Sequence, residues 1–557
     1  MYKEIIVNVK NEESRVAVLE DKQLVEIYIE RSQNERLVGN IYKGQVENVL
    51  PGMQAAFVDI GLEKNAFLYV EDAVNSRGEG QISADKLNIN DVLKQGQEII
   101  VQIVKEPIGT KGPRVTTNIT LPGRYMVLMP EVDYIGISRR IVDETERERL
   151  RETAARMKPE GMGVIVRTVA EGVTEEEIEK DIRLLSKLWE KIHNKSNNGP
   201  VPNLLHRDLE LVQRMLRDVF SEDVDRLIID SREEFQRVME LLDMIDPKLK
   251  VKVRYENREN VFEDFGIEVE VQKSLKKQVW LKCGAYLVID QAEALTAIDV
   301  NTGKFVGSTD LEDTVLKTNM DAAVEISRQL RLRNIGGIVI VDFIDMMQEE
   351  HRQQVLHILE QEIKKDKTKV NILGITQLGL VEMTRKKVSP SLSEVVQKTC
   401  PYCEGRGKVL SEESVGIQVK GEIQQMARLT SAETILVEAN PLVAARIIGS
   451  GGAGLRELEY QTGKNLFIRG CANHHIEQVT VKPLHDQEEI EGGKLPVKAG
   501  EILKVRVEEP HVTNTDDGIA RLDGYILDIQ GAGMMAGKTV SIEVQKVYRT
   551  YAKAKLL

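Results

Sequence analysis

Two apolar segments that each carry an aspartate constrain the fold of this chain most strongly. Residues 294–301 (ALTAIDVN) contain Asp299, and residues 336–345 (GGIVIVDFID) contain Asp342. Continuous apolar runs of this kind predict fully buried strands, where an ionised carboxylate is tolerated only beside a partner or a metal ion. Carboxylate oxygens favour Mg²⁺ over zinc as that ion.

The segment between the two strands predicts a helix. Its apolar residues recur at helical spacing behind a Ser-Thr-Asp cap at residues 308–310, and they are Leu311, Val315, Ala322, Ile326 and Leu330. A strand–helix–strand unit brings its strands side by side, which would bring Asp299 and Asp342 together. The alternative from spacing alone is that each aspartate only ends its strand. Asp345 is predicted to be structural, because a three-residue step along a strand points to the opposite face.

Three motifs resemble the ribonuclease E/G family. They are AIDVNTGK at residues 297–304, RQLRLRNIGGIVIVDFIDM at residues 328–346 and GLVEMTRK at residues 379–386. The likeness extends in order from the N-terminus to about Arg406.

The resemblance implies a reaction and a set of residues for it. In the family, the residues that match Asp299 and Asp342 bind Mg²⁺, and the residue that matches Asn301 helps to position it. The implied reaction is endonucleolytic hydrolysis of single-stranded RNA to a 5′-phosphate and a 3′-hydroxyl. None of the eight histidines lies in either aspartate motif, which argues against a pair of catalytic imidazoles. The alternative class is a non-catalytic RNA-binding protein in which these acids have become structural.

Length and charge bound the remaining possibilities. A chain of 557 residues with 41% hydrophobic residues predicts about three to five domains. It has no apolar run long enough to cross a membrane and no apolar signal core at residues 1–10, so a cytoplasmic protein is expected. The net charge of −13 is unusual for an RNA-binding protein. However, basic residues cluster in or beside the catalytic motifs, at residues 273–277, 328–333, 364–369 and 385–387.

Residues 37–118 predict a small five-stranded barrel, with short strands at residues 38–49, 54–60, 65–70, 98–105 and 114–117. The segment 39–61 is similar to the RNA-binding OB fold first recognised in a ribosomal protein. Phe57 and Phe67 are expected to stack on bases, and Lys105 and Lys111 match basic positions of the family. The alternative is that both rings fill the barrel core.

Residues 121–130 and 161–168 are similar to the family's pocket for a 5′-terminal monophosphate. The resemblance implies a guanidinium from Arg167, a hydroxyl from Thr168 and main-chain contacts near Gly123 and Val127. It also implies stimulation by a 5′-monophosphate, a preference for AU-rich RNA, and roles in RNA decay and in rRNA and tRNA processing. By itself, the sequence is equally consistent with an exposed arginine that ends a strand.

The four cysteines are Cys283, Cys400, Cys403 and Cys471. The sequence TCPYCEGRG spaces Cys400 and Cys403 as half of a zinc site, and zinc takes four ligands. In the family the other two ligands come from a second subunit, which implies a homodimer or homotetramer. The alternatives are Cys471 with His474 or His475 of the same chain, or a redox pair.

We therefore expect a multidomain α/β and β protein. A ribonuclease-H-like scaffold in two parts (1–36 and 212–276) would be interrupted by the OB-fold barrel (37–118) and the 5′-phosphate region (119–211). A DNase-I-like catalytic α/β domain (277–398), a zinc link (399–412), a small KH-like domain (413–494) and a TRAM-like barrel (495–557) would follow. The KH expectation rests on Gly-Ser-Gly-Gly at residues 449–452, for which a glycine-rich helix entry is the alternative. No long Pro-rich or Arg-rich tail follows, so we expect no scaffold for a large degradosome.

Overall fold

The chain forms two compact units, residues 1–397 and 398–557. The computed structural model describes residues 2–31, 36–74, 88–107, 111–258, 260–303, 311–449, 452–485, 497–511, 514–522, 525–548 and 551–557. None of the helices in these ranges has both the length and the apolar composition that a membrane-spanning segment needs.

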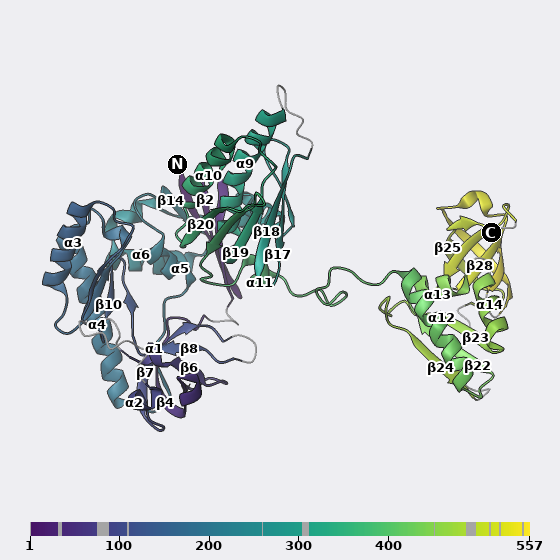
Figure 1. Cartoon of the computed structure of the whole chain (residues 1–557), viewed down its shortest axis with the longest axis horizontal. Coiled ribbons are helices and arrows are strands. Elements are labelled where there is room, and N and C mark those ends of the chain that lie inside the picture. Colours follow the sequence, from purple (N-terminus) through teal and green to yellow (C-terminus); the bar gives the residue numbers. More distant parts are fainter. Residues whose placement is uncertain are drawn as a thin grey trace. The chain divides into compact units, whose positions relative to one another are not determined.

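The first sheet of unit 1 joins the N-terminal strands to a later part of the chain (Figure 1). Its strand order is β15-β14-β1-β2-β3, with β1–β3 antiparallel and with β14 and β15 parallel to β1. The strands are β1 (Lys3–Lys10), β2 (Glu13–Glu20), β3 (Gln23–Arg31), β14 (Arg226–Ile229) and β15 (Val253–Tyr255). Helices α5 (Leu211–Asp218) and α6 (Arg232–Ile245) pack on one face, and α7 (Val261–Asp264) and α8 (Ile267–Ser274) pack on the other.

A closed five-stranded barrel follows β3, as the sequence predicted. Its strands are β4 (Ile41–Leu50), β5 (Ala55–Asp59), β6 (Ala66–Tyr69), β7 (Glu98–Lys105) and β8 (Arg114–Thr116). They pair in the order β4-β5-β6-β8-β7, and a β4–β7 pairing closes the barrel. Two short helices, α1 (Val70–Ala73) and α2 (Ile89–Val92), and the added strand β13 (Asn203–His206) complete it. Gly44 allows β4 to approach β5, because a Cβ there would lie 2.6 Å from the Asp59 carbonyl oxygen.

In the sequence, a four-stranded sheet follows the barrel and precedes β14 and β15, the later strands of the first sheet. Its order is β11-β12-β10-β9, with β9 (Leu121–Pro122), β10 (Met126–Met129), β11 (Ile135–Ile137) and β12 (Gly163–Val166). Helix α3 (Glu144–Met157) and the 24-residue α4 (Glu175–Asn198) bury their apolar faces against it.

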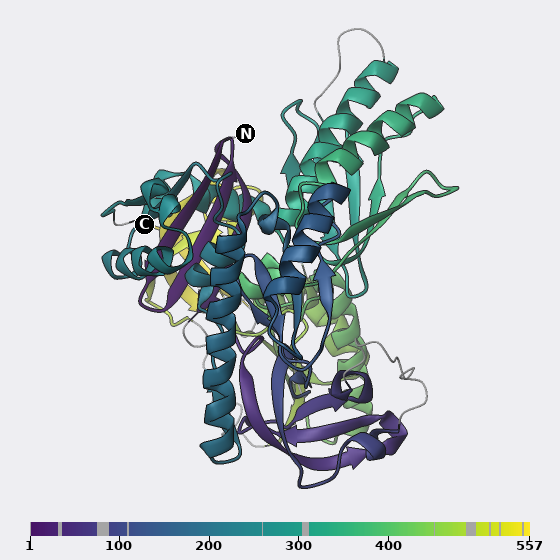
Figure 2. The same cartoon turned by 90° about the vertical axis from the view of Figure 1, so that its left-hand side faces the viewer.

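The last sheet of unit 1 contains both aspartate motifs. Its order is β16-β17-β18-β19-β21-β20, with β16 (Gln278–Trp280), β17 (Tyr286–Gln291), β18 (Leu295–Asn301), β19 (Gly337–Asp342), β20 (Val370–Ile375) and β21 (Val381–Arg385). Helices α9 (Leu311–Leu332) and α10 (Glu349–Ile363) lie side by side on one face (Figures 1 and 2). The short α11 (Leu392–Val396) follows. The predicted β18–α9–β19 unit is confirmed, and its predicted cap lies outside the described residues.

Unit 2 begins with the Cys-x-x-Cys turn and a small α/β domain. The domain contains α12 (Glu412–Leu429), β22 (Thr434–Ala439), α13 (Pro441–Ile448), α14 (Ala453–Thr462), β23 (Asn465–Gly470) and β24 (Thr480–Leu484). Its strand order is β23-β22-β24. The turn between α13 and α14 begins at Gly449 and ends at Gly452, which both have positive φ; residues 450 and 451 lie outside the described part.

A six-stranded sheet closes the chain, in the order β25-β29-β30-β28-β27-β26. Its strands are β25 (Ile502–Arg506), β26 (Glu509–Pro510), β27 (Gly518–Leu522), β28 (Tyr525–Gln530), β29 (Thr539–Val547) and β30 (Tyr551–Leu556). Ile448, at the end of α13, packs against Ile519 and Ile526 of this sheet. The glycine turn of the small domain therefore begins at its contact with the last sheet.

Candidate active site

Asp299 and Asp342 lie directly opposite each other on adjacent parallel strands. Strands β18 and β19 pair in parallel, and the last residue pair in their register is Asp299–Asp342. Neighbouring strands are about 4.8 Å apart, and paired residues project from the same face. The backbone therefore brings the two carboxylates to one place, although they are 43 residues apart in sequence.

The prediction that these strands are fully buried was wrong. Along β18, buried Thr296, Ile298 and Val300 alternate with exposed residues that include Asp299. The buried face of the sheet packs on α9 and α10, and the other face is open. Asp342 is also exposed. Each carboxylate therefore stands on a solvated surface and needs no partner to offset burial.

Two amide side chains fix the surroundings of the carboxylates. Asn301 Nδ2 donates to Asp299 Oδ2 at 2.8 Å, which sets the orientation of that carboxylate. Asn319 of α9 is fully buried and bonds both backbone groups of Ile344, two residues beyond Asp342. Asp345 is exposed beyond the end of β19.

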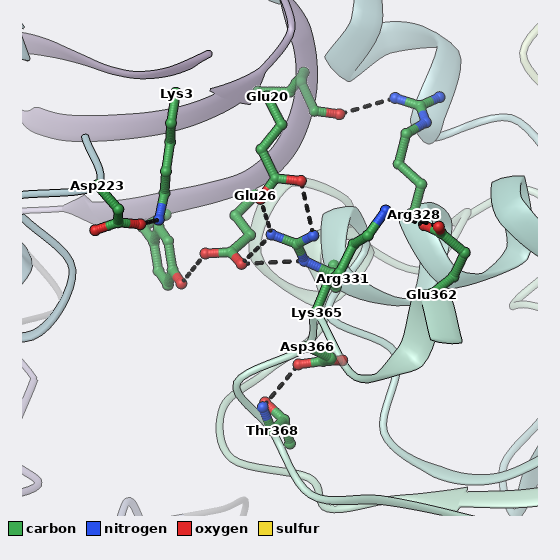
Figure 3. A network of polar contacts seen from close by, with 12 residues as sticks. Lys3, Glu20, Glu26, Asp223, Arg328, Arg331, Glu362, Lys365, Asp366 and Thr368 are labelled. Atoms are coloured by element: carbon green, nitrogen blue, oxygen red, sulfur yellow. Dashed lines mark hydrogen bonds and ion pairs between the residues drawn. The ribbon is translucent and has the colours of Figure 1, made fainter. Parts of the chain in front are cut away.

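The arginines near the motifs hold unit 1 together, in contrast to the expectation that they are basic residues available to RNA. Arg331 of α9 donates to Glu20 at 2.7 Å and to Glu26 at 2.9 Å (Figure 3). Burial alone would lower the pKa of Arg331, but these two carboxylates raise it. Arg331 thereby attaches α9 to β2 and β3.

Two further arginines of the basic clusters are internal. Arg385 donates to Asp366 Oδ2 at 2.7 Å, and both side chains are more than nine-tenths buried. Arg333 bonds Gln329 at 2.7 Å, and burial lowers its pKa to about 10. The sequence showed where these charges lie in the chain, but not that they face inward.

On the barrel, the aromatic and basic residues singled out from the sequence form one row. Phe57 pairs with Phe67 across β5 and β6, Phe67 with Arg114 across β6 and β8, and Arg114 with Lys105 across β8 and β7. The two phenylalanine rings are 5.5 Å apart and half-buried on the outer face, so they do not fill the core. Lys111 is exposed in the loop before β8.

Tyr69 extends this row and was missed in the sequence. Its ring lies 4.5 Å from that of Phe67, under the Arg114 guanidinium at 4.6 Å, and it is 38% exposed. The strand alternation was a usable signal, because Tyr69 follows Phe67 by two residues and therefore shares its face.

Arg167 lies beside Gly123, and its guanidinium has partners within the chain. Arg167 donates to the Gly123 carbonyl at 2.5 Å and to Asp218 Oδ1 at 2.8 Å. Asp181 accepts three backbone N–H groups of the turn after Gly123. Burial raises the pKa of Asp181, although these N–H groups oppose the rise.

Of the other two predicted phosphate contacts, Thr168 begins the 3₁₀ turn after β12 and Val127 lies in β10. Thr168 shares a 2.8 Å hydrogen bond with the Ser138 hydroxyl. Val127 pairs with Ile165 in the β10–β12 ladder.

A cavity of about 580 Å³ opens beside Arg167. Five cationic side chains line it, and they are Arg36, Arg167, Arg214, Arg217 and Lys367. Two acids, Asp208 and Asp218, also line it, so its lining carries a positive balance. Gly123, Val127 and Thr168 are outside this lining.

Cys400 and Cys403 form a tight turn at the start of unit 2. The Gly407 N–H donates to Cys403 Sγ at 3.4 Å, and the N–H groups of Cys403 and Tyr402 lower the pKa of the Cys400 thiol. No group of three or more metal-ligating side chains occurs in the described ranges. Both ring nitrogens of His475 have partners, Tyr402 O at 2.6 Å and the Glu477 N–H at 3.1 Å, which disfavours this histidine as a ligand from the same chain.

Comparison with known proteins assigns this arrangement to a family. The model of the ribonuclease E/G family matches residues 120–388, and the TRAM domain model matches residues 496–557. Ribonuclease G of Escherichia coli is 43% identical over 496 residues, covering 88% of this chain and 99% of the relative. The chain belongs to the ribonuclease E/G family.

Other relatives agree with this assignment. Ribonuclease G of Haemophilus influenzae is 43% identical over 484 residues, covering 86% of this chain and 99% of the relative. Ribonuclease E of a Nostoc species is 42% identical over 422 residues, covering 75% of this chain and 60% of the relative. As a ribonuclease E/G family member, the chain is an endoribonuclease that acts on RNA, and its last sheet is a TRAM domain.

Proposed function

We propose that this endoribonuclease hydrolyses single-stranded RNA internally with Mg²⁺ held between Asp299 and Asp342, leaving a 5′-phosphate and a 3′-hydroxyl. The observation that carries the proposal is the direct register of the two aspartates on β18 and β19. Neither carboxylate has a cationic partner among the described residues, and Asn301 is the polar partner of Asp299. Two solvated carboxylates without a counter-charge fit a hard divalent cation.

Bound there, Mg²⁺ would polarise the scissile phosphate, orient a water for in-line attack and offset charge on the leaving 3′ oxygen. The chain's own residues prepare this site. Asn301 fixes Asp299 Oδ2, so the other oxygen of Asp299 stays available to a ligand. The open face of the sheet gives an RNA strand access to both carboxylates.

A cleavage assay with a matched control tests the proposal. The substrate is a short 5′-monophosphorylated, AU-rich RNA, incubated with Mg²⁺ or with EDTA. Asp342→Asn should abolish internal cleavage, whereas Asp345→Asn, an exposed aspartate of the same segment, should retain it. Cleavage by both Asp299→Asn and Asp342→Asn would remove the proposed metal site.

A preference for 5′-monophosphorylated RNA is part of the proposal. The cationic cavity beside Arg167 supports a phosphate site, since the lining cations outnumber the acids. A terminal phosphate there would compete with Asp218 for Arg167. By likeness to the family, Gly123, Val127 and Thr168 would also contact the phosphate, from the Gly123 side of Arg167 and outside the cavity lining. By likeness to the family, the substrates would be mRNA and precursors of rRNA and tRNA in the cytoplasm.

The other modules of the chain support binding of single strands. The barrel presents Phe57, Phe67 and Tyr69 as half-exposed rings beside Lys105 and Arg114, and Lys111 lies in the neighbouring loop. The first sheet is consistent with a ribonuclease-H-like scaffold and the α9–α10 sheet with a DNase-I-like domain. The turn that joins α13 to α14 is consistent with a KH-like module, and it begins next to the TRAM domain.

We assign Cys400 and Cys403 to an inter-subunit zinc site. Their N–H···S contacts and the tight turn are typical of thiolate ligands, and zinc bound there would supply only structure. Two thiolates leave two positions for a second subunit. A homodimer or homotetramer would result.

A further inference from the structure

We propose that Trp280 and Tyr286 form a stacking platform for a nucleobase of the RNA strand next to the Asp299–Asp342 pair. The inference rests on the proposed function and adds a substrate-positioning element to it. Neither aromatic residue belongs to the motifs that identify the family.

The register of three strands places the platform. Trp280 of β16 pairs with Tyr286 of β17, and Tyr286 pairs with Asn301 of β18. Paired residues of antiparallel strands have Cβ atoms about 5 Å apart on one face. Asn301 shares that face with Asp299, whose carboxylate it bonds. The indole therefore lies about two strand spacings, roughly 10 Å, from the catalytic motif.

The packing of the two rings suits a stacking site. Trp280 is 56% exposed, and its ring centroid is 5.3 Å from that of Tyr286 at an interplanar angle of 57°. Tyr286 is held from the other side by the turn after Asn301, since a Cβ on Gly303 would lie 3.1 Å from Tyr286 Cδ1. Tyr286 is therefore packed against the chain, while a large part of Trp280 remains open to solvent.

The surroundings favour a nucleotide over a protein partner. Next to Tyr286 on this face are the polar groups of Asn301 and Asp299, with partly exposed Val288 opposite Asp299. The exposed apolar pair Leu295 and Ile338 lies at the other end of β18 and β19. A nucleotide has both an aromatic base and a polar phosphate. Its base can stack on Trp280 or Tyr286 while its phosphate lies near the polar groups of Asn301 and Asp299.

Tryptophan fluorescence gives a direct test. The chain has two tryptophans, and Trp189 is 7% exposed in the core of the α3–α4 region. In the Asp342→Asn background, Trp189→Phe leaves Trp280 as the single reporter. Titration with a short AU-rich RNA should quench it saturably, with a midpoint that matches binding followed by anisotropy of fluorescein-labelled RNA. If Trp189→Phe misfolds, the difference between the Asp342→Asn protein and its Trp280→Phe variant supplies the same signal.

Kinetics provide a second readout. Trp280→Ala should raise KM about ten-fold, the lower part of the range for loss of one stacked base, with little change in kcat. Trp280→Phe should bring KM most of the way back to the parental value. Tyr255→Ala, which removes a partly exposed ring of the first sheet, should leave KM unchanged. Unquenched fluorescence at saturating RNA, or an unchanged KM in Trp280→Ala, would overturn the platform even where the parent cleaves. Quenching without Mg²⁺-dependent cleavage would support the platform and overturn the metal proposal.

Discussion

Asn319 of α9 and Ile344, two residues beyond Asp342, are joined in both directions: Asn319 Nδ2 donates to the Ile344 carbonyl at 2.8 Å, and the Ile344 N–H donates to Asn319 Oδ1 at 3.1 Å. The helix between the two aspartate strands therefore holds the backbone on which Asp342 stands. Sequence periodicity predicts the helix, but it assigns no role to this asparagine.

Asn319→Leu should impair both stability and catalysis. The change leaves two backbone groups of Ile344 without partners, which costs about 2–4 kcal/mol. We expect a lower urea midpoint and a fall of about ten-fold or more in kcat, because the end of β19 is released. The control is Asn371→Ala, an exposed asparagine on the edge strand β20. Unchanged kcat in a folded Asn319→Leu enzyme would contradict the positioning role.

Arg331→Met should destabilise unit 1 while leaving the RNA affinity of the folded enzyme nearly unchanged. The substitution leaves the largely buried carboxylates of Glu20 and Glu26 without their cationic partner. Loss of one member of such a network costs about 3–5 kcal/mol. Urea denaturation measures the loss, and the triple variant Glu20→Gln, Glu26→Gln, Arg331→Met should recover part of it. A variant of parental stability that binds RNA more weakly would instead identify Arg331 as an RNA contact.

The sequence predicted the parts of the fold that follow from local periodicity. The five barrel strands and the β18–α9–β19 unit appear where alternation and helical spacing indicated them. The register of Asp299 with Asp342 depends on strand pairing across 43 residues, so spacing could indicate proximity but not direct opposition.

Two sequence expectations failed for a common reason, which is that local composition does not reveal which face is solvated. The apolar run around Asp299 was interpreted as buried throughout, although one face of the sheet is open. The basic cluster at residues 328–333 was interpreted as favouring RNA binding, but Arg331 of α9 and Arg333, which follows the helix, are both buried. The partners of Arg331, Glu20 and Glu26, lie about 300 residues earlier in the chain, beyond the reach of any pattern in α9.

Arg167→Ala should reduce the advantage of 5′-monophosphorylated over 5′-hydroxyl RNA. The guanidinium donates to the Gly123 carbonyl, and it also lines the cationic cavity. The measurement is kcat/KM for the monophosphorylated RNA divided by kcat/KM for the 5′-hydroxyl RNA. We expect this ratio to fall about ten-fold, because one charge-assisted contact is lost. Arg183→Ala, on an exposed face of α4, serves as the control. Equal ratios in Arg167→Ala and the parent would exclude Arg167 from this role.

Glu146→Gln should lower stability at pH 7 and have a clearly smaller effect at pH 3. The hydrogen bonds from Arg149, aided by the Gly172 N–H, hold the pKa of Glu146 at about 2, below its ordinary value of 4.5. A carboxyl whose pKa is lowered by folding stabilises the protein fully at pH values above its unfolded-state pKa. This contribution is lost as pH falls from about 4.5 towards 2. For an ion pair partly open to water we expect about 1 kcal/mol, measured by urea denaturation.

The matched control for this pH dependence is Glu148→Gln. Glu148 lies on the same helix in a more exposed pair with Arg151, so its replacement should change stability little at either pH. An equal loss in Glu146→Gln at pH 7 and pH 3 would show that the effect is not electrostatic.

Replacing Cys400 and Cys403 together by serine should release zinc and reduce the size of the oligomer. Each chain offers two thiolates at this turn, and no third metal ligand joins them in the described ranges. Zinc with four ligands therefore needs a second chain. Light scattering should show a smaller mass for the double variant, and a chelator assay should show at most a trace of bound zinc.

Chelation of the parent by a strong zinc ligand should reproduce the change in mass, since the metal and not the thiols alone would join the subunits. Cys283→Ser and Cys471→Ser are the matched controls and should retain both mass and zinc. A double variant with parental mass but without zinc would place the subunit interface elsewhere. If Cys471→Ser instead released the zinc, a site within one chain would replace the bridging one.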